Sequence, residues 1–321
     1  MLAVCGVVNG QQTADQDEKI ETSTNLVTVN VVVTDRHGEY LTSLVRENFR
    51  IYDDGVRQQI SHFSFEQDPV SIGIVLEVAE GRAEGTRAIL NVLRTFTRTM
   101  RDKDDFFLIS FGRGGSVSTN FIPTFDQVSD LRNPAEHGGP SSLYDAVFAA
   151  SGQLRTKPTL KKTLLIISDG QDRQSVTSYD KLRSRLREFD VHVYAIGRSN
   201  SANNLAAAGR RWVFEDVTRN SGWRPPLLDS DVAMARAVLA EMSRVSGGTT
   251  YFPEAESEPE LIAICTQIAV ELRNQYTLGF YPTTNPTKRP HRLRITVEVP
   301  HLPQGISLWY RDKYQPSLKH E

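Results

Sequence analysis

The chain has 321 residues, of which 39% are hydrophobic and 24% charged, a composition typical of a folded protein and not of a disordered one. Its 37 Lys and Arg against 39 Asp and Glu give a net charge of −2, which argues against a dedicated nucleic-acid-binding protein. Its two cysteines, Cys5 and Cys265, are too few for a disulfide framework or a cysteine-based zinc site, and no apolar run reaches the ~18 residues of a membrane-spanning helix.

The N-terminal segment differs in character from the rest. Residues 1–8 (MLAVCGVV) are apolar and lead into a polar stretch, which matches half of the pattern of a secretion signal. The positively charged start of such a signal is missing, so two interpretations stay open. We favour an extracytoplasmic protein, secreted or in the envelope, over a cytoplasmic one. We interpret residues 1–24 as a truncated signal segment and linker.

Strand patterns open the folded part of the chain. Residues 26–34 (LVTVNVVVT) are rich in β-branched side chains, and two further strands, 49–52 and 57–65, flank the hairpin signal Asp54-Gly55. This unit is too small to bury a core alone, so we expect it to pair with another part of the chain.

Buried strands then alternate with amphipathic helices. The patterns predict strands at 71–76, 105–111, 117–122, 163–168, 191–197 and 249–252, and helices at 86–100, 142–154, 179–189, 231–245 and 258–273. The alternation predicts an α/β fold with a doubly wound, mainly parallel sheet. Residues 199–230 break the pattern, and a connection of that length is usually functional or disordered.

Strand patterns also close the chain, at 276–281, 291–299 and 306–310. Because the strands at either chain end would leave unpaired edges on their own, we predict that both sets form one small β-sandwich. The predicted domains are therefore a sandwich of residues 25–68 plus 276–312, and an inserted α/β domain of residues 69–275.

Three polar loops lie where open α/β sheets bind ligands, at the carboxyl ends of strands. The first is 77–81, the second 138–145 before a helix, and the third 169–172. Around them the chain resembles the von Willebrand factor A-type domain. The resemblance rests on IGIVLEVAEG (72–81), GGPSSLYDAV (138–147), LLIISDGQD (164–172) and VHVYAIG (191–197).

The flanking strands and the tail ELRNQYTLGFYPT (271–283) are similar to the bacterial VWFA-related family, whose members are typically secreted or envelope-associated. In A-type domains the three loops form a metal-ion-dependent adhesion site, where an Asp-x-Ser-x-Ser loop, a Thr and an Asp hold Mg²⁺. The resemblance therefore implies a domain that binds a protein partner at this edge.

This chain departs from the ligand pattern of that site. Glu77 stands at the position of the first Asp, Ala79 and Gly81 replace the two serines, Ser141 replaces the Thr, and Asp169 is kept. Two of three hydroxyl ligands are absent, and Glu77 is one methylene longer than Asp. The resemblance thus implies a degenerate site of Glu77, Ser141 and Asp169, where Mg²⁺ binding is weak or lost and a looser Ca²⁺ or Mn²⁺ site stays open.

The same residues have a plain structural interpretation, since Asp169 can cap a turn and Ser141 can cap the following helix. We assign further residues of the three loops to a ligand-binding rim: Glu80, Gly81, Pro140, Ser142, Gly170 and Asp172.

No motif of a serine hydrolase elbow, P-loop, dinucleotide fold or zinc protease is present. His192 alternates within a strand and is interpreted as a packed residue, and the basic segment 288–294 as a solvated hairpin face. The sequence predicts a non-enzymatic, adhesion-type module that binds a protein ligand. The alternatives are a functional cation-dependent domain and, less favoured, a hydrolase with Asp169 and Glu77 as an acid/base pair.

Overall fold

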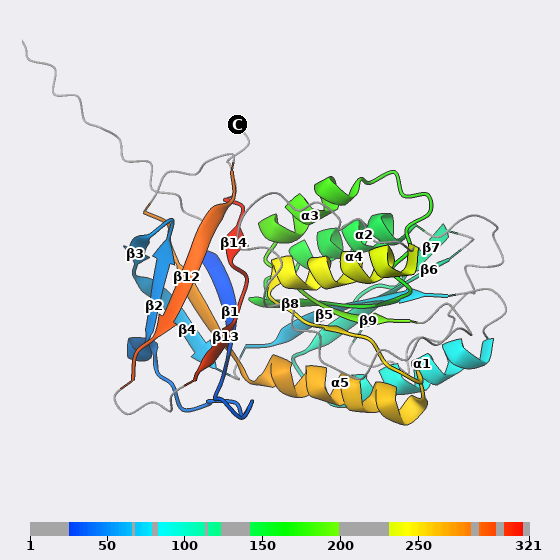
Figure 1. The fold of residues 1–321 in the computed structure, drawn as a ribbon, viewed down its shortest axis with the longest axis horizontal. Helices are drawn as coiled ribbons and strands as arrows, with labels where there is room; N and C mark the ends of the chain where they lie inside the picture. The colour runs from blue at the N-terminus through cyan, green and yellow to red at the C-terminus, as the bar shows by residue number, and fades with distance from the viewer. Residues whose placement is uncertain are drawn as a thin grey trace, which may run out of the picture.

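The computed structural model describes residues 26–65, 68–78, 83–112, 115–122, 142–198, 231–283, 289–299 and 305–316. The predicted signal segment and the loop 199–230 lie outside these residues. The described chain forms a helix-covered central sheet with two antiparallel sheets beside it (Figure 1).

The central sheet has six strands in the order β10-β9-β8-β5-β6-β7. Its strands are Val70–Glu77 (β5), Asp105–Gly112 (β6), Gly115–Ser118 (β7), Lys161–Ser168 (β8), His192–Gly197 (β9) and Thr250–Tyr251 (β10). All neighbours run parallel except β6 and β7. Every residue of β5 and β9 is buried, as strands covered on both faces must be.

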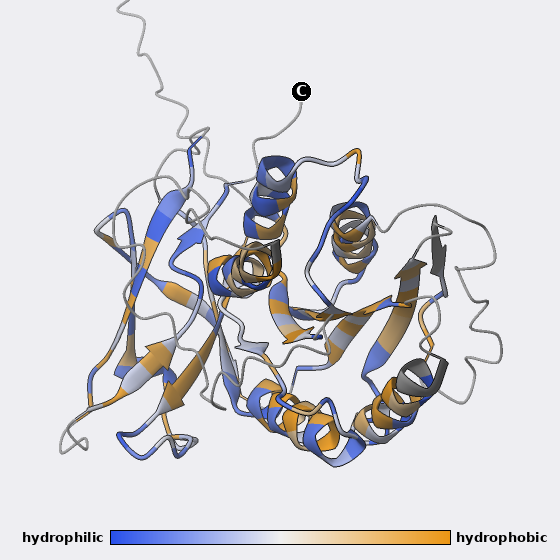
Figure 2. Cartoon of the chain, turned by 45° about the vertical axis from the view of Figure 1, so that its right-hand side comes forward, coloured by the Kyte–Doolittle hydropathy of each residue, from blue (hydrophilic) through white to orange (hydrophobic). Residues whose placement is uncertain are grey.

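Helices cover both faces of this sheet (Figure 2). On one face lie Ala83–Thr97 (α1) and Glu258–Arg273 (α5), and on the other Leu143–Arg155 (α2), Tyr179–Glu188 (α3) and Asp231–Ser246 (α4). Each set packs its apolar side chains onto one sheet face, which gives two separate cores. The predicted doubly wound α/β fold class is confirmed. Among the described residues, no helix combines the length and apolar character that crossing a bilayer requires.

The two antiparallel sheets face each other. One has the order β13-β1-β11-β4 and the other β14-β12-β2-β3. Their strands, with a short 3-10 helix (η1, Arg46–Asn48) before β2, are Val27–Thr34 (β1), Phe49–Asp53 (β2), Val56–Gln58 (β3), Ile60–Phe65 (β4), Gln275–Phe280 (β11), His291–Val297 (β12), Ser307–Trp309 (β13) and Lys313–Tyr314 (β14).

Each antiparallel sheet joins strands from both ends of the chain. In one, β1 pairs with β11, and in the other, β2 pairs with β12. Side chains from both sheets share one core, which includes Val31, Ile51, Tyr276 and Leu293. The two pairs of strands come together because neither chain end alone supplies enough apolar surface.

Buried polar contacts join this sandwich to the α/β part. Arg311 is 3% exposed, donates from Nη2 to the backbone oxygen of Thr28 at 2.6 Å and forms an ion pair with Asp190 at 3.0 Å. Lys161 Nζ donates to the backbone oxygen of Gln275 at 3.1 Å. Lys161 begins β8, so the sandwich lies at the amino ends of the parallel strands. Their carboxyl ends point to the opposite pole of the molecule (Figure 1).

Candidate functional site

Glu77 and Asp169 meet at the carboxyl edge of the central sheet, where the neighbouring strands β5 and β8 end. The Glu77 side chain turns inward. Its Oε2 accepts hydrogen bonds from the Ser168 hydroxyl at 2.8 Å and from the backbone N–H of Asp169 at 2.9 Å. The structure thus brings two of the three predicted metal ligands together. The third, Ser141, lies outside the described residues, as do the predicted rim residues Glu80, Gly81 and Pro140.

An arginine that sequence reasoning missed lies at the same edge. Arg198 directly follows β9, and its side chain is 6% exposed. Its Nη1 donates to the backbone oxygen of Glu77 at 3.2 Å, and its Nε lies 3.6 Å from a carboxylate oxygen of Glu256. The edge therefore carries a largely buried arginine–glutamate ion pair. The position of Arg198 directly after the strand predicted at 191–197 was the one feature of the sequence that indicated its place at this edge.

Asp172 fixes the loop that follows β8 against the start of α2. Its Oδ1 accepts from the backbone N–H of Tyr144 at 3.0 Å and from the Ser175 hydroxyl at 2.6 Å. Burial of the phenol and, to a lesser extent, the charge of Asp172 raise the pKa of Tyr144 to about 12. The predicted rim residue Asp172 thus has an internal role in shaping the loop.

Asp145, in the first turn of α2, holds the far end of the same loop. Its two carboxylate oxygens accept from the backbone N–H groups of Val176 and Thr177, each at 2.9 Å. Desolvation raises the pKa of Asp145, but hydrogen bonds from Thr177 and Val176 together lower it more, so the net pKa is below its ordinary value. Val176 lies at the surface, and the residue is 96% exposed. The loop is therefore rigidly held yet presents an apolar side chain to solvent.

The other described rim residues lie beside this loop. Ser142 is the N-cap residue of α2 but makes no side-chain capping hydrogen bond. Gly170 has a φ of +82°, and a Cβ there would lie 2.5 Å from the backbone oxygen of Ala235 in α4. Only glycine allows α4 to approach the loop this closely.

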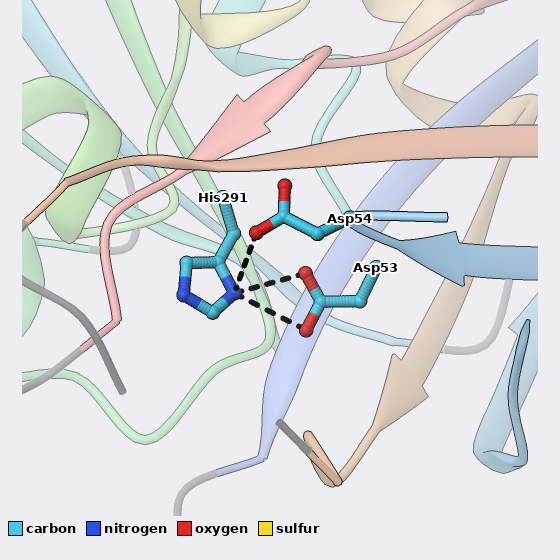
Figure 3. Close-up of side chains that lie close together, drawn as sticks. All are labelled: Asp53, Asp54 and His291. Carbon is cyan, nitrogen blue, oxygen red and sulfur yellow. Dashed lines mark hydrogen bonds and ion pairs between the residues drawn. The ribbon is translucent and has the colours of Figure 1, made fainter. Parts of the chain in front are cut away.

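A second group of candidate metal ligands lies in the sandwich, far from the rim. Figure 3 shows His291 directed at Asp53 and Asp54. Its Nδ1 lies 3.0 and 3.3 Å from the two carboxylate oxygens of Asp53, and 3.7 Å from Oδ2 of Asp54. One ligand atom from each side chain lies within 4.8 Å of the others, so the group could hold a divalent cation. The same contacts also describe a buried hydrogen bond between a histidine and a carboxylate.

The interpretation of residues 288–294 as a solvated face is wrong for His291. The residue is 1% exposed because the alternation of β12 turns its side chain inward together with Leu293 and Ile295. The Tyr314 hydroxyl donates to Asp53 Oδ2 at 3.0 Å, and burial and the Asp53 charge raise the pKa of Tyr314.

Comparison with known proteins identifies a matching family model and similar solved structures. Residues 70–211 match the family model described as von Willebrand factor type A domain. No curated protein sequence matches the chain. Similar solved structures include an aerotolerance-related membrane protein from Bacteroides fragilis, with 12% identity and a TM-score of 0.44 over 63% of this chain and 98% of that one.

Two further similar structures are a von Willebrand factor type A protein from Catenulispora acidiphila and a minor pilin, PilB, from Streptococcus sanguinis. The first has 10% identity and a TM-score of 0.42 over 83% of this chain and 72% of that one. The second has 11% identity and a TM-score of 0.43 over 65% and 62%. These similarities are too low to carry a function over to this chain.

Proposed function

Because the chain contains a von Willebrand factor type A domain within residues 70–211, we propose that it is a non-enzymatic, adhesion-type module that binds a protein partner at the carboxyl edge of its central sheet. The placement of this edge carries the proposal. The sandwich lies at the amino ends of the strands, so it does not cover the loops around Asp169 and Val176. Ligands of open α/β sheets bind at this edge.

Recognition in this proposal does not pass through a metal bridge. The donor set does not fit Mg²⁺, which demands near-ideal octahedral oxygen ligands. The first loop lacks both serine hydroxyls, and the Glu77 carboxylate accepts two hydrogen bonds from its own chain. Arg198, paired with Glu256, holds the backbone of Glu77 at the same edge. Shape and hydrogen bonding by the rim loops then select the partner.

We further propose an extracytoplasmic location, secreted or in the envelope. The support is the half-complete signal pattern of residues 1–8 and the resemblance to the bacterial VWFA-related family. Export of a reporter fused after residue 24 tests this proposal, and retention of the reporter in the cytoplasm contradicts it.

Calorimetric titration of the full chain with Mg²⁺, Mn²⁺ and Ca²⁺ tests metal-independent recognition. We expect the wild type and the Asp169→Asn variant to give the same heat with each metal. A saturable isotherm that is lost in Asp169→Asn would establish the alternative, a cation-dependent domain. Heat that survives Asp169→Asn but disappears in Asp54→Asn would belong to the group around His291.

Capture of partners from envelope fractions tests the binding edge itself. Val176→Asp changes a residue that is 96% exposed, so it should abolish capture without unfolding the chain. Val270→Asp, on α5 and 43% exposed, is the matched control and should leave capture intact. Equal capture by both variants contradicts binding at the rim, and loss of capture on chelation contradicts its metal independence.

A further inference from the structure

The outward face of the sheet β14-β12-β2-β3 is strongly basic. Strand alternation turns Ile51, Leu293 and Ile295 into the sandwich core, so the intervening side chains face out. These include five cations, which we call the basic sheet face: Arg50, Arg57, Arg292, Arg294 and Lys313. Figure 1 shows β2 and β3 at the end of this sheet that is far from the α/β domain, whereas β14, at the other end, lies beside α3.

Few carboxylates offset this charge. Glu298, just after β12, forms an ion pair with Arg50 at 3.1 Å. Asp54, in the β2–β3 turn, accepts from the backbone N–H of Arg292 at 2.9 Å and its Oδ2 lies 3.7 Å from His291. Within the described part of the chain, the other four cations of the face form no ion pair with a carboxylate.

The unpaired cations are neighbours across the sheet. Arg292 lies opposite Lys313, and Arg57 and Arg294 flank Tyr52 in register. Adjacent strands are about 4.8 Å apart, and like charges directly opposite each other destabilise a sheet. The chain as a whole is acidic, with a net charge of −2, so the concentration of cations here is local. A bound anion would relieve the repulsion.

The chemistry of the face discriminates between anionic partners. Among the described outward residues of these strands, Tyr52 is the one aromatic side chain. The Arg294 guanidinium already lies 4.0 Å from the centre of its ring, so this ring face is not open to stack on a nucleobase. Among the described strands of this sheet, Val56 is the one exposed large hydrophobic residue, at 49%, and a single valine offers too little apolar surface to insert into a lipid layer. Four of the five cations are arginines, whose planar forks bind carboxylates through two hydrogen bonds.

We propose that the basic sheet face binds an acidic, carboxylate-rich polypeptide segment of a partner protein. This surface is separate from the rim, because the sandwich and the rim lie at opposite poles of the molecule. Arg292 and Arg294 stand two residues apart on β12, a spacing of about 6.7 Å. An extended acidic segment presents alternate side chains at the same spacing.

Fluorescence anisotropy of a labelled octaglutamate peptide with the full chain tests this proposal. We expect saturable binding that weakens with added salt, and no binding of an octaglutamine peptide of the same length. Exposed arginine–carboxylate pairs contribute modestly one by one, so the triple variant Arg57→Gln, Arg292→Gln, Arg294→Gln should bind about tenfold more weakly.

The matched control lowers the net charge equally at another surface. Arg94, Arg98 and Lys103 are exposed on or just after α1, and their triple change to Gln should leave octaglutamate binding unaltered. Equal weakening in both triple variants, or no binding by the wild type, overturns the proposal. The proposal is also overturned if a single-stranded oligonucleotide or anionic lipid vesicles bind more tightly than octaglutamate and this binding depends on the same three arginines. Both variants should keep the wild-type unfolding midpoint, because all six positions are exposed.

Discussion

His192 makes the stability of this protein sensitive to acid. The side chain is 1% exposed at the start of β9, and within the described structure neither ring nitrogen has a hydrogen-bond partner. Burial lowers its pKa from 6.5 to about 4; the charge of Asp190 opposes this shift, while Arg311 and Lys161 reinforce it. The folded protein therefore holds a neutral imidazole in the range where the unfolded chain is already protonated.

The sign and size of the effect follow from that difference. The unfolded state binds the proton as the pH falls through 6.5, and the folded state only near 4, so stability is complete above 6.5 and declines between these values. At 1.36 kcal/mol for each pKa unit, the full loss is about 3 kcal/mol. By about pH 5 the loss is roughly 2 kcal/mol.

His192→Leu removes the titrating ring and keeps an apolar side chain of similar size. Since a buried polar group without a partner costs free energy, we expect the variant to be at least as stable as the wild type near neutral pH. Urea unfolding at about pH 7.5 and about pH 5 should give a stability advantage that grows by roughly 2 kcal/mol in acid. Parallel pH profiles for the two proteins would refute this reasoning, because the other titrating groups are common to both.

Other predictions concern the junction and the rim. Burial lowers the pKa of Lys161 from 10.5 to about 8, so the free energy of unfolding of the wild type should rise by about 2 kcal/mol between about pH 8 and pH 10. Urea unfolding of Lys161→Met should lack this rise. Gly170→Ala should destabilise the fold by about 2 kcal/mol because of its positive φ and the close approach of α4, whereas Gly152→Ala, in an open helical position, should stabilise it by about 0.5–1 kcal/mol in the same denaturation assay. Asp145→Ala should free the rim loop and speed tryptic cleavage after Arg173 several-fold, and unchanged cleavage would show that these hydrogen bonds do not hold the loop.

The elements that the sequence predicted best are those whose pattern is local. The apolar run 71–76 became β5 at Val70–Glu77, and the helical spacing in 258–273 became α5 with the same bounds. A strand buried on both faces needs only its own residues to be recognised. The parallel direction of the sheet follows from the same alternation of strands and helices.

Side-chain partners distant in sequence could not be predicted in this way. The inward turn of Glu77 depends on the hydroxyl of Ser168, which lies 91 positions further along the chain. Arg198 lies beside Glu77 because β9 and β5 both flank β8, which no local pattern encodes. His291 is a different case: the alternation HRLRITV already indicated that it shares the inward face with Leu293, and the neighbouring arginines hid that signal.

The rigid junction decides how the two proposed surfaces relate. Arg311 bonds to the backbone of Thr28 in the sandwich and pairs with Asp190 in the α/β domain, and it is almost fully buried between them. Removing one partner of a buried charge pair leaves the other uncompensated, so bending at this junction would be costly. The rim and the basic sheet face are thus held at opposite poles, and one molecule can engage both partners at once. Occupancy of one surface should then leave affinity at the other unchanged, because no described segment is shared between them.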